Sequence, residues 1–143
     1  ELAASIVSPW ADPSRLKLVD SQPKAAIGKL LANLALAISA EGMKEALLFG
    51  DATGLTAAET LDLLDSTGLS FMANLKRDFV LGDRSTDPGD FTVDALCKDS
   101  KLMLDTAGQV LPGIQAAVES FTIQQDHGRG DHDFSAILVH RSE

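Results

Sequence analysis

The stretch KAAIGKLLANLALAISAEGMKEALLFGDAT, residues 24–53, decides the fold of this chain. No proline interrupts it, and Gly54 follows it directly. The pattern predicts one long helix whose apolar residues fall on nearly every side and not along a single stripe. A helix of this kind is covered all round, either at the centre of a helical bundle or inside a subunit interface.

Shorter helical segments follow this long one. Thr56 and Glu59 form a capping box that begins a short helix ending before Gly68. Further helices are expected over residues 71–81 (with Ser70 as the cap and Gly82 as the stop), about 92–110, 112 to about 125, and about 133–140. The alternation that is typical of strands is almost absent. The sequence therefore predicts an all-α fold: a single domain of about six helices around one long central buried helix.

The first 23 residues differ in composition from the rest of the chain. They carry Pro9, Pro13 and Pro23 with Asp and Ser between them, which is typical of a linker or a short docking helix. We therefore expect residues 1–23 to form a linker or N-terminal extension, and residues 24–143 to form the helical domain.

The composition excludes several classes of function. The chain has 143 residues, which suits one domain, and its net charge of −9 makes nucleic acid an unsuitable partner. The single cysteine, Cys97, excludes an internal disulfide and indicates a reducing, cytoplasmic compartment. The most apolar run, residues 27–40, is interrupted by Lys29, Asn33 and Ser39 and is shorter than the roughly 20 residues of a membrane span. We therefore expect neither a nucleic-acid nor a membrane partner.

Lys29 and Asn33 are the first candidate site residues. They lie four positions apart on the predicted long helix, so they share one face among apolar neighbours. A buried lysine loses the hydration of its charged form and becomes a usable general acid or base. The alternative is that Lys29, close to the helix start, extends its ammonium into water while Asn33 faces a loop.

Lys98 and Asp99 are the second candidate pair. Neighbouring residues on a helix point about 100° apart, so only one of the two can face a given pocket fully. Taken from the residues alone, a solvated charge pair beside Lys101 and Asp105 is the favoured interpretation.

The segment DHGRGDHD, residues 126–133, resembles a metal site at first sight, but it lacks helical His-x-x-x-His spacing and cysteine. A glycine-rich turn in which Asp131 or Asp133 caps the last helix is the favoured interpretation, so no metal is expected. The segment is not a dinucleotide fingerprint either, because no predicted strand precedes it. Cys97 is expected in the core.

Three motifs in order resemble the C-terminal helical domain of the β-hydroxyacid dehydrogenases, the family of 3-hydroxyisobutyrate dehydrogenase, glyoxylate/succinic semialdehyde reductase and related 6-phosphogluconate dehydrogenase-like enzymes. The resemblance covers about residues 25–140. The motifs are Gly28-Lys29-x-x-x-Asn33, Phe91-x-x-x-x-Leu96-x-Lys98-Asp99 and Gly128-x-Gly130-x-x-Asp133-x-Ser135-Ala136.

The resemblance implies a role for each candidate residue. Lys29 matches the lysine that exchanges the proton of the substrate hydroxyl while a hydride passes to or from NAD or NADP. Asn33 matches an asparagine that holds the substrate. Phe91 and Asp99 are implied to line the substrate cleft, and Lys98 to reach the cofactor.

Family members also carry an N-terminal Rossmann domain, whereas residues 1–23 contain no Gly-x-Gly-x-x-Gly. The resemblance therefore implies that NAD or NADP is bound mainly by a domain outside these 143 residues, and that this chain alone is inactive. It also implies a small hydroxyacid, or a related aldehyde or ketoacid, as substrate, and a homodimer. The alternative is a helical interaction or dimerisation module without catalytic activity.

Overall fold

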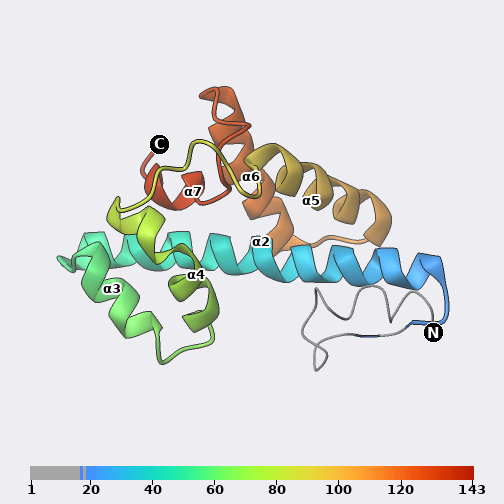
Figure 1. The fold of residues 1–143 in the computed structure, drawn as a ribbon, viewed down its shortest axis with the longest axis horizontal. Helices are drawn as coiled ribbons and strands as arrows, with labels where there is room; N and C mark the ends of the chain where they lie inside the picture. Colours follow the sequence, from blue (N-terminus) through green and yellow to red (C-terminus); the bar gives the residue numbers. More distant parts are fainter. Residues whose placement is uncertain (1–16, 18) are drawn as a thin grey trace.

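The computed structural model describes residue 17 and residues 19–143, so the docking helix considered for the N-terminal extension lies mostly outside the described residues. The described part is built of helices, with one isolated bridge between Thr92 and Asp133 in place of any strand. This confirms the predicted all-α fold. Figure 1 shows the helices α2 (Gln22–Thr53), α3 (Ala57–Leu64), α4 (Ser70–Leu81), α5 (Val93–Ala107), α6 (Pro112–Asp126) and α7 (Ala136–Val139).

The long helix α2 is the axis of the domain and contacts each of the other five helices. Figure 1 shows α5, α6 and α7 on one side of it, with α3 and α4 near its C-terminal end. The predicted central helix is confirmed, although it begins at Gln22 and not at Lys24. Pro23 occupies its first turn, where the missing backbone N–H costs no intrahelical hydrogen bond.

The described chain covers α2 only in part, which differs from the predicted burial on all sides. Ala37, Ala40, Met43 and Leu47 are fully buried in the core. The apolar side chains Ile27, Leu31 and Ile38, by contrast, are 53%, 59% and 42% exposed. The reason is that the surrounding helices are short and pack mainly along one side and near the C-terminal end of α2 (Figure 1).

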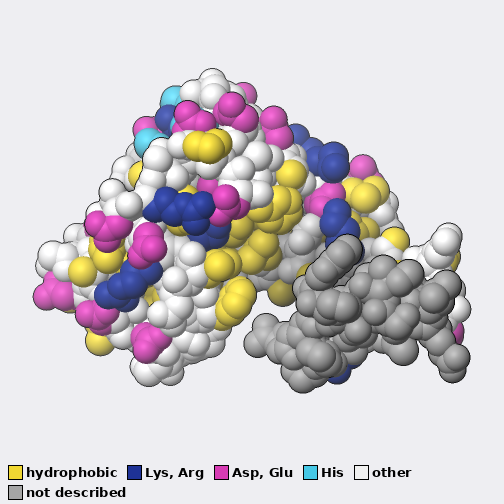
Figure 2. Space-filling model, in the orientation of Figure 1, with side chains coloured by type: hydrophobic (Ala, Val, Ile, Leu, Met, Phe, Trp, Pro, Cys, Tyr) yellow, Lys and Arg dark blue, Asp and Glu magenta, His cyan; other side chains and the backbone are white. Residues whose placement is uncertain are grey.

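The exposed apolar side chains of α2 are also relevant to whether this helix could cross a membrane. An 18-residue window of α2 has a mean hydropathy of 1.3, so by length and composition alone this helix is apolar enough to cross a membrane. The core helix of a packed domain meets the same test but is mostly buried, whereas 22% of this window is buried among the described residues. Figure 2 shows hydrophobic side chains gathered in the middle of one face, where α2 meets α5 and α6.

Most helix ends follow the sequence signals. Gly54, Gly82 and Gly108 end α2, α4 and α5 with φ of 83°, 84° and 63°, a conformation that only glycine adopts without strain. The capping box at the start of α3 is confirmed. Ser70 differs from the prediction because it is the first residue of α4 and Leu69 is the cap. The last helix, α7, is also much shorter than predicted.

The loop before α5 is tied to the segment before α7 by backbone hydrogen bonds. The N–H groups of Val93 and Asp94 donate to the carbonyl oxygens of His132 and Gly130, both at 2.9 Å. A Cβ on Gly89, in the loop before α5, would lie 2.4 Å from the backbone N of Asp133, so this close approach requires glycine. The start of α5 is therefore held by the segment that follows α6.

Candidate active site

Lys29, Asn33 and Asp99 come together between α2 and α5. Lys29 Nζ donates to Asp99 Oδ2 at 3.0 Å, and Asn33 Nδ2 donates to the same oxygen at 2.7 Å. The two α2 residues are one helical turn apart and face α5, whereas Asp99 lies some 70 residues further along the chain. The structure thus joins two of the motifs that the sequence analysis selected.

The buried member of this group is the carboxylate and not the amine. The side chain of Asp99 is 7% exposed, whereas that of Lys29 is 69% exposed. The expectation of a desolvated Lys29 is therefore wrong, because its side chain lies at the edge of the contact between α2 and α5 and is not enclosed by it. Lys29 presents its ammonium to solvent, with one hydrogen bond to the buried Asp99.

Lys98 and Asp99 have opposite surroundings although they are adjacent. The Lys98 side chain is 78% exposed, and its ammonium lies 3.9 Å from Asp99 Oδ1. The hypothesis of a solvated charge pair is therefore wrong for Asp99 and correct for Lys98. The 100° between successive helical residues turns Asp99 toward α2 and leaves Lys98 on the outer face of α5.

The neighbours of Asp99 keep its carboxyl ionised. Burial by itself raises the pKa of Asp99, but the hydrogen bonds from Lys29 and Asn33, together with the charges of Lys29 and Lys98, outweigh it. The pKa of Asp99 therefore lies below its ordinary value. A permanent carboxylate in this position keeps an acceptor for the Lys29 ammonium at every pH near neutrality.

We expect a defined pH dependence from this carboxylate. Because the pKa of Asp99 is lower in the folded chain, its ionised form contributes stability that is complete above the unfolded pKa of about 3.9 and is lost as the pH falls through the lowered value. Urea unfolding of the wild type and Asp99→Asn should show a constant difference in free energy above about pH 5 that shrinks below about pH 4. A difference that grows on acidification would contradict this assignment.

Phe91, the remaining candidate for the substrate cleft, lies just before α5 and is half-buried. Its ring packs edge-on against Phe134, with ring centroids 6.1 Å apart and planes at 80°. An open groove of about 510 Å³ lies along α5, with Gln125 of α6 at its edge. Two cations, Lys98 and Lys101, and two carboxylates, Asp94 and Asp105, line it.

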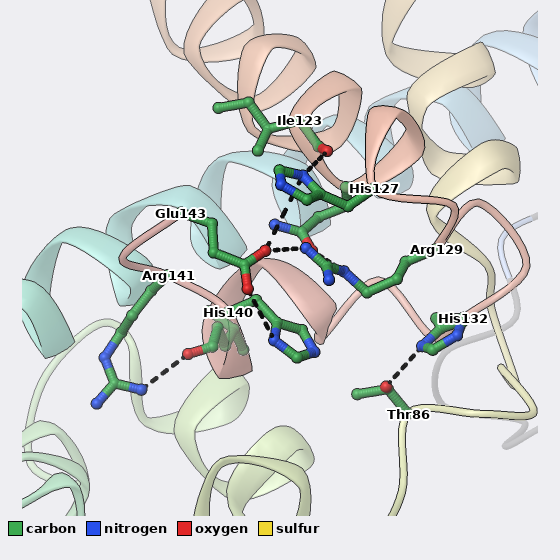
Figure 3. A network of polar contacts seen from close by, with 10 residues as sticks. Thr86, Ile123, His127, Arg129, His132, His140, Arg141 and Glu143 are labelled. Carbon is green, nitrogen blue, oxygen red and sulfur yellow. Dashed lines mark hydrogen bonds and ion pairs between the residues drawn. The ribbon is translucent and has the colours of Figure 1, made fainter.

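The segment over residues 126–133 makes structural contacts. Among the described residues, no group of three or more His, Cys, Asp or Glu side chains has the arrangement of a metal site. Figure 3 shows that His127, Arg129 and His140 gather around Glu143, while His132 Nδ1 lies 2.9 Å from Thr86 Oγ1. The burial of Cys97, at 1% exposed, confirms its predicted place in the core.

One buried charge pair was not predicted from the sequence. Lys76 Nζ lies 2.7 Å from Asp133 Oδ1, and the two side chains are 6% and 0% exposed. A signal existed, because Lys76 shares the apolar face of α4 with Met72, Ala73 and Phe79 at spacings of three and four. Asp133 was predicted as a possible cap of the last helix. Its Oδ1 accepts from the N–H of Ser135, which is itself the residue before α7, so Asp133 lies one position further from the helix than a cap.

The comparison with protein families decides the identity of the domain. Residues 24–140 match the model of the family described as NAD-binding of NADP-dependent 3-hydroxyisobutyrate dehydrogenase. The chain belongs to this family. It is accordingly a domain of the NAD(P)-dependent β-hydroxyacid dehydrogenases, as the three motifs predict.

A solved structure supports the fold of this dehydrogenase-family domain. The chain is similar to 3-hydroxyisobutyrate dehydrogenase of Mycobacterium tuberculosis, determined with L-serine, with a TM-score of 0.62 and 20% sequence identity. The match covers 82% of this chain but 43% of that enzyme, so the chain spans less than half the length of its relative. No curated protein matches the sequence.

Proposed function

We propose that this chain is the substrate-binding and dimerising domain of an NAD(P)-dependent hydroxyacid dehydrogenase, with Lys29 as its proton-transfer group. The observation that carries the proposal is the convergence of Lys29 and Asn33 on one oxygen of the buried Asp99. An exposed ammonium that is held in place by a fixed carboxylate is suited to meet a substrate arriving from solvent.

The reaction needs a group that can give a proton to, or take one from, the oxygen bound to the substrate carbon that exchanges the hydride. The nicotinamide of NAD or NADP supplies or accepts the hydride at the substrate carbon. In the reducing direction, the Lys29 ammonium donates a proton to the carbonyl oxygen as that oxygen gains the electron pair of the C=O bond. In the oxidising direction the step runs in reverse: Lys29 first releases its proton to solvent, and its amine then takes the proton of the substrate hydroxyl. Asp99 holds the ammonium, and the remaining capacity of the Asn33 amide is free to bind the substrate.

The residues that the family resemblance assigns to substrate and cofactor fit a small hydroxyacid and a phosphate-bearing cofactor. Phe91 supplies an aromatic wall, while the exposed ammonium of Lys98, beside the groove on α5, suits a dinucleotide phosphate. The solved relative was determined with L-serine, which is itself a β-hydroxyacid. We therefore propose a small β-hydroxyacid, or the related aldehyde or ketoacid, as the substrate.

The experiment that tests this function compares the chain with and without a dinucleotide-binding domain. The relative is more than twice as long as the matched region, which supports a dinucleotide-binding domain elsewhere in the working enzyme. We expect the 143 residues alone to oxidise no 3-hydroxyisobutyrate or related β-hydroxyacid with NAD or NADP, and the same residues joined to that domain to turn it over. Turnover by the chain alone, or none in the joined protein, would contradict the proposal. The second outcome would favour a non-catalytic interaction module.

A homodimer is the expected assembly. Ile27, Leu31 and Leu34 line an apolar cavity of about 150 Å³ between α2 and the end of α5, and Leu31 is 59% exposed. Each large apolar side chain left in water forgoes roughly 1.5–3 kcal/mol. Sedimentation at micromolar concentration should therefore show a dimer in which α2 is packed by both subunits, and Leu31→Glu should shift it toward monomer. A wild-type monomer would refute the dimer.

A further inference from the structure

Lys76 is a charged side chain enclosed in the core of the domain. Its ammonium lies 2.7 Å from Asp133 Oδ1 and over two aromatic rings, 4.0 Å from the centre of Phe134 and 4.8 Å from that of Phe79. Removing both charges of an ion pair from water is costly, and an apolar pair of similar volume is often equally stable. A gain in folding stability therefore does not by itself explain why a charged pair occupies this buried position.

The partner of Lys76 holds the backbone at Phe91, which the proposed function assigns to the substrate cleft. Asp133 Oδ2 accepts from the N–H of Phe91 at 3.4 Å, and the N–H of Asp133 donates to the carbonyl oxygen of Thr86 at 2.7 Å. The N–H of Phe134 donates to the carbonyl oxygen of Phe91 at 2.9 Å. Lys76 on α4 is thus connected through Asp133 to the N–H of Phe91, whose carbonyl oxygen is held by the next residue, Phe134.

A second connection runs through the aromatic rings. The Lys76 ammonium contacts the face of Phe134, and Phe134 meets Phe91 in an edge-on contact. A cation over a ring face is attracted by the π electrons, so it restrains the ring's position. Loss of Lys76 would release the Asp133 carboxylate and the Phe134 ring together, and both restrain Phe91.

We propose that Lys76 is a positioning residue that places Phe91, the wall of the substrate cleft, through its ion pair with Asp133 and its contact with Phe134. The proposal rests on the proposed function, which gives Phe91 its contact with the substrate. Lys76 itself lies inside the core and touches no reacting group.

The structural test uses the 143-residue chain and NMR signals of the Phe91 amide and ring. Lys76→Met keeps the length of the side chain and removes the charge, and it should shift both signals. Arg77→Met is the matched control, since Arg77 is the next residue on α4 and its ion pair with Asp62 is exposed. The control should leave the Phe91 signals unchanged.

A double variant separates positioning from stability. Lys76→Met leaves Asp133 as an unpaired buried charge, whereas Lys76→Met with Asp133→Leu removes both charges. We expect the double variant to regain folding stability while the Phe91 signals stay displaced, because the N–H of Phe91 has lost its acceptor. Phe91 signals at their wild-type positions in either folded variant would overturn the proposal.

The kinetic test uses the enzyme joined to its dinucleotide-binding domain. Lys76→Met is expected to raise KM for the hydroxyacid by about tenfold while kcat changes by less than about threefold, because a displaced wall weakens binding but leaves Lys29 in place. An unchanged KM would overturn the proposal. If the unsubstituted joined enzyme shows no turnover, the proposed function fails, and the NMR result still decides whether Lys76 positions Phe91.

Discussion

Replacing Lys29 by alanine is expected to lower turnover by about 10²–10⁴-fold in the enzyme joined to its dinucleotide-binding domain, the usual range for loss of a general acid or base. The substrate oxygen then has no positioned proton donor or acceptor, although Asp99 and Asn33 remain. The affinity for NAD or NADP should change little, because Lys29 acts at the substrate. Steady-state kinetics and cofactor titration measure the two effects.

Two further variants test whether the expected loss of turnover comes from the loss of proton transfer by Lys29. Lys29→Arg should not restore turnover, because a guanidinium keeps its proton near neutral pH. Lys24→Ala removes another ammonium from the first turns of α2, one that pairs with the exposed Asp20 at 2.7 Å, and should leave turnover unchanged. Wild-type turnover in Lys29→Ala would end the catalytic assignment and favour the interaction module.

Replacing Asp133 by alanine is expected to destabilise the domain by about 3–5 kcal/mol, because it leaves the Lys76 ammonium buried without its partner. The N–H groups of Phe91 and Ser135 lose their acceptor as well. The hydrogen bonds from Lys76 and Ser135 and the Lys76 charge already hold the pKa of Asp133 below its ordinary value against the effect of burial. Urea unfolding at neutral pH measures the loss.

The matched control for this loss is Asp62→Ala. Asp62 also pairs with a cation of α4, Arg77, but its side chain is 67% exposed, so its removal should cost less than about 1 kcal/mol. If both substitutions lowered the free energy of unfolding equally, burial of the Lys76–Asp133 pair would not determine its contribution to stability.

Helix identity and most helix ends could be predicted because their signals are local. Thr56 and Glu59 lie within one turn, and the left-handed conformation at Gly54 and Gly82 needs only the missing side chain. The cap of α4, one residue earlier than predicted, and the short α7 were less predictable. The segment before α7 is held by contacts with distant segments, such as the hydrogen bonds of Asp133 to α4 and to the loop before α5.

Burial was predicted less well than helix position. The apolar pattern of α2 shows that the helix needs cover, but not whether the cover comes from the same chain. The described helices bury Ala37 and Met43 and leave Ile27 and Leu31 in solvent. Both a buried and a solvent-exposed Lys29 were considered, and its side chain is exposed because it lies at the edge of the contact between α2 and α5, where it reaches Asp99.

The local sequence was sufficient for an all-α domain and for Lys29 and Asn33 sharing one face of a helix, since both follow from the 3.6-residue period. It was not sufficient to show that Asp99 receives both side chains or that Lys76 meets Asp133, because these partners are 66, 70 and 57 residues apart. Contacts between residues so far apart in the sequence depend on how the helices pack together. The packing also selects which of the adjacent Lys98 and Asp99 leaves water, and with it which of the two joins the candidate active site.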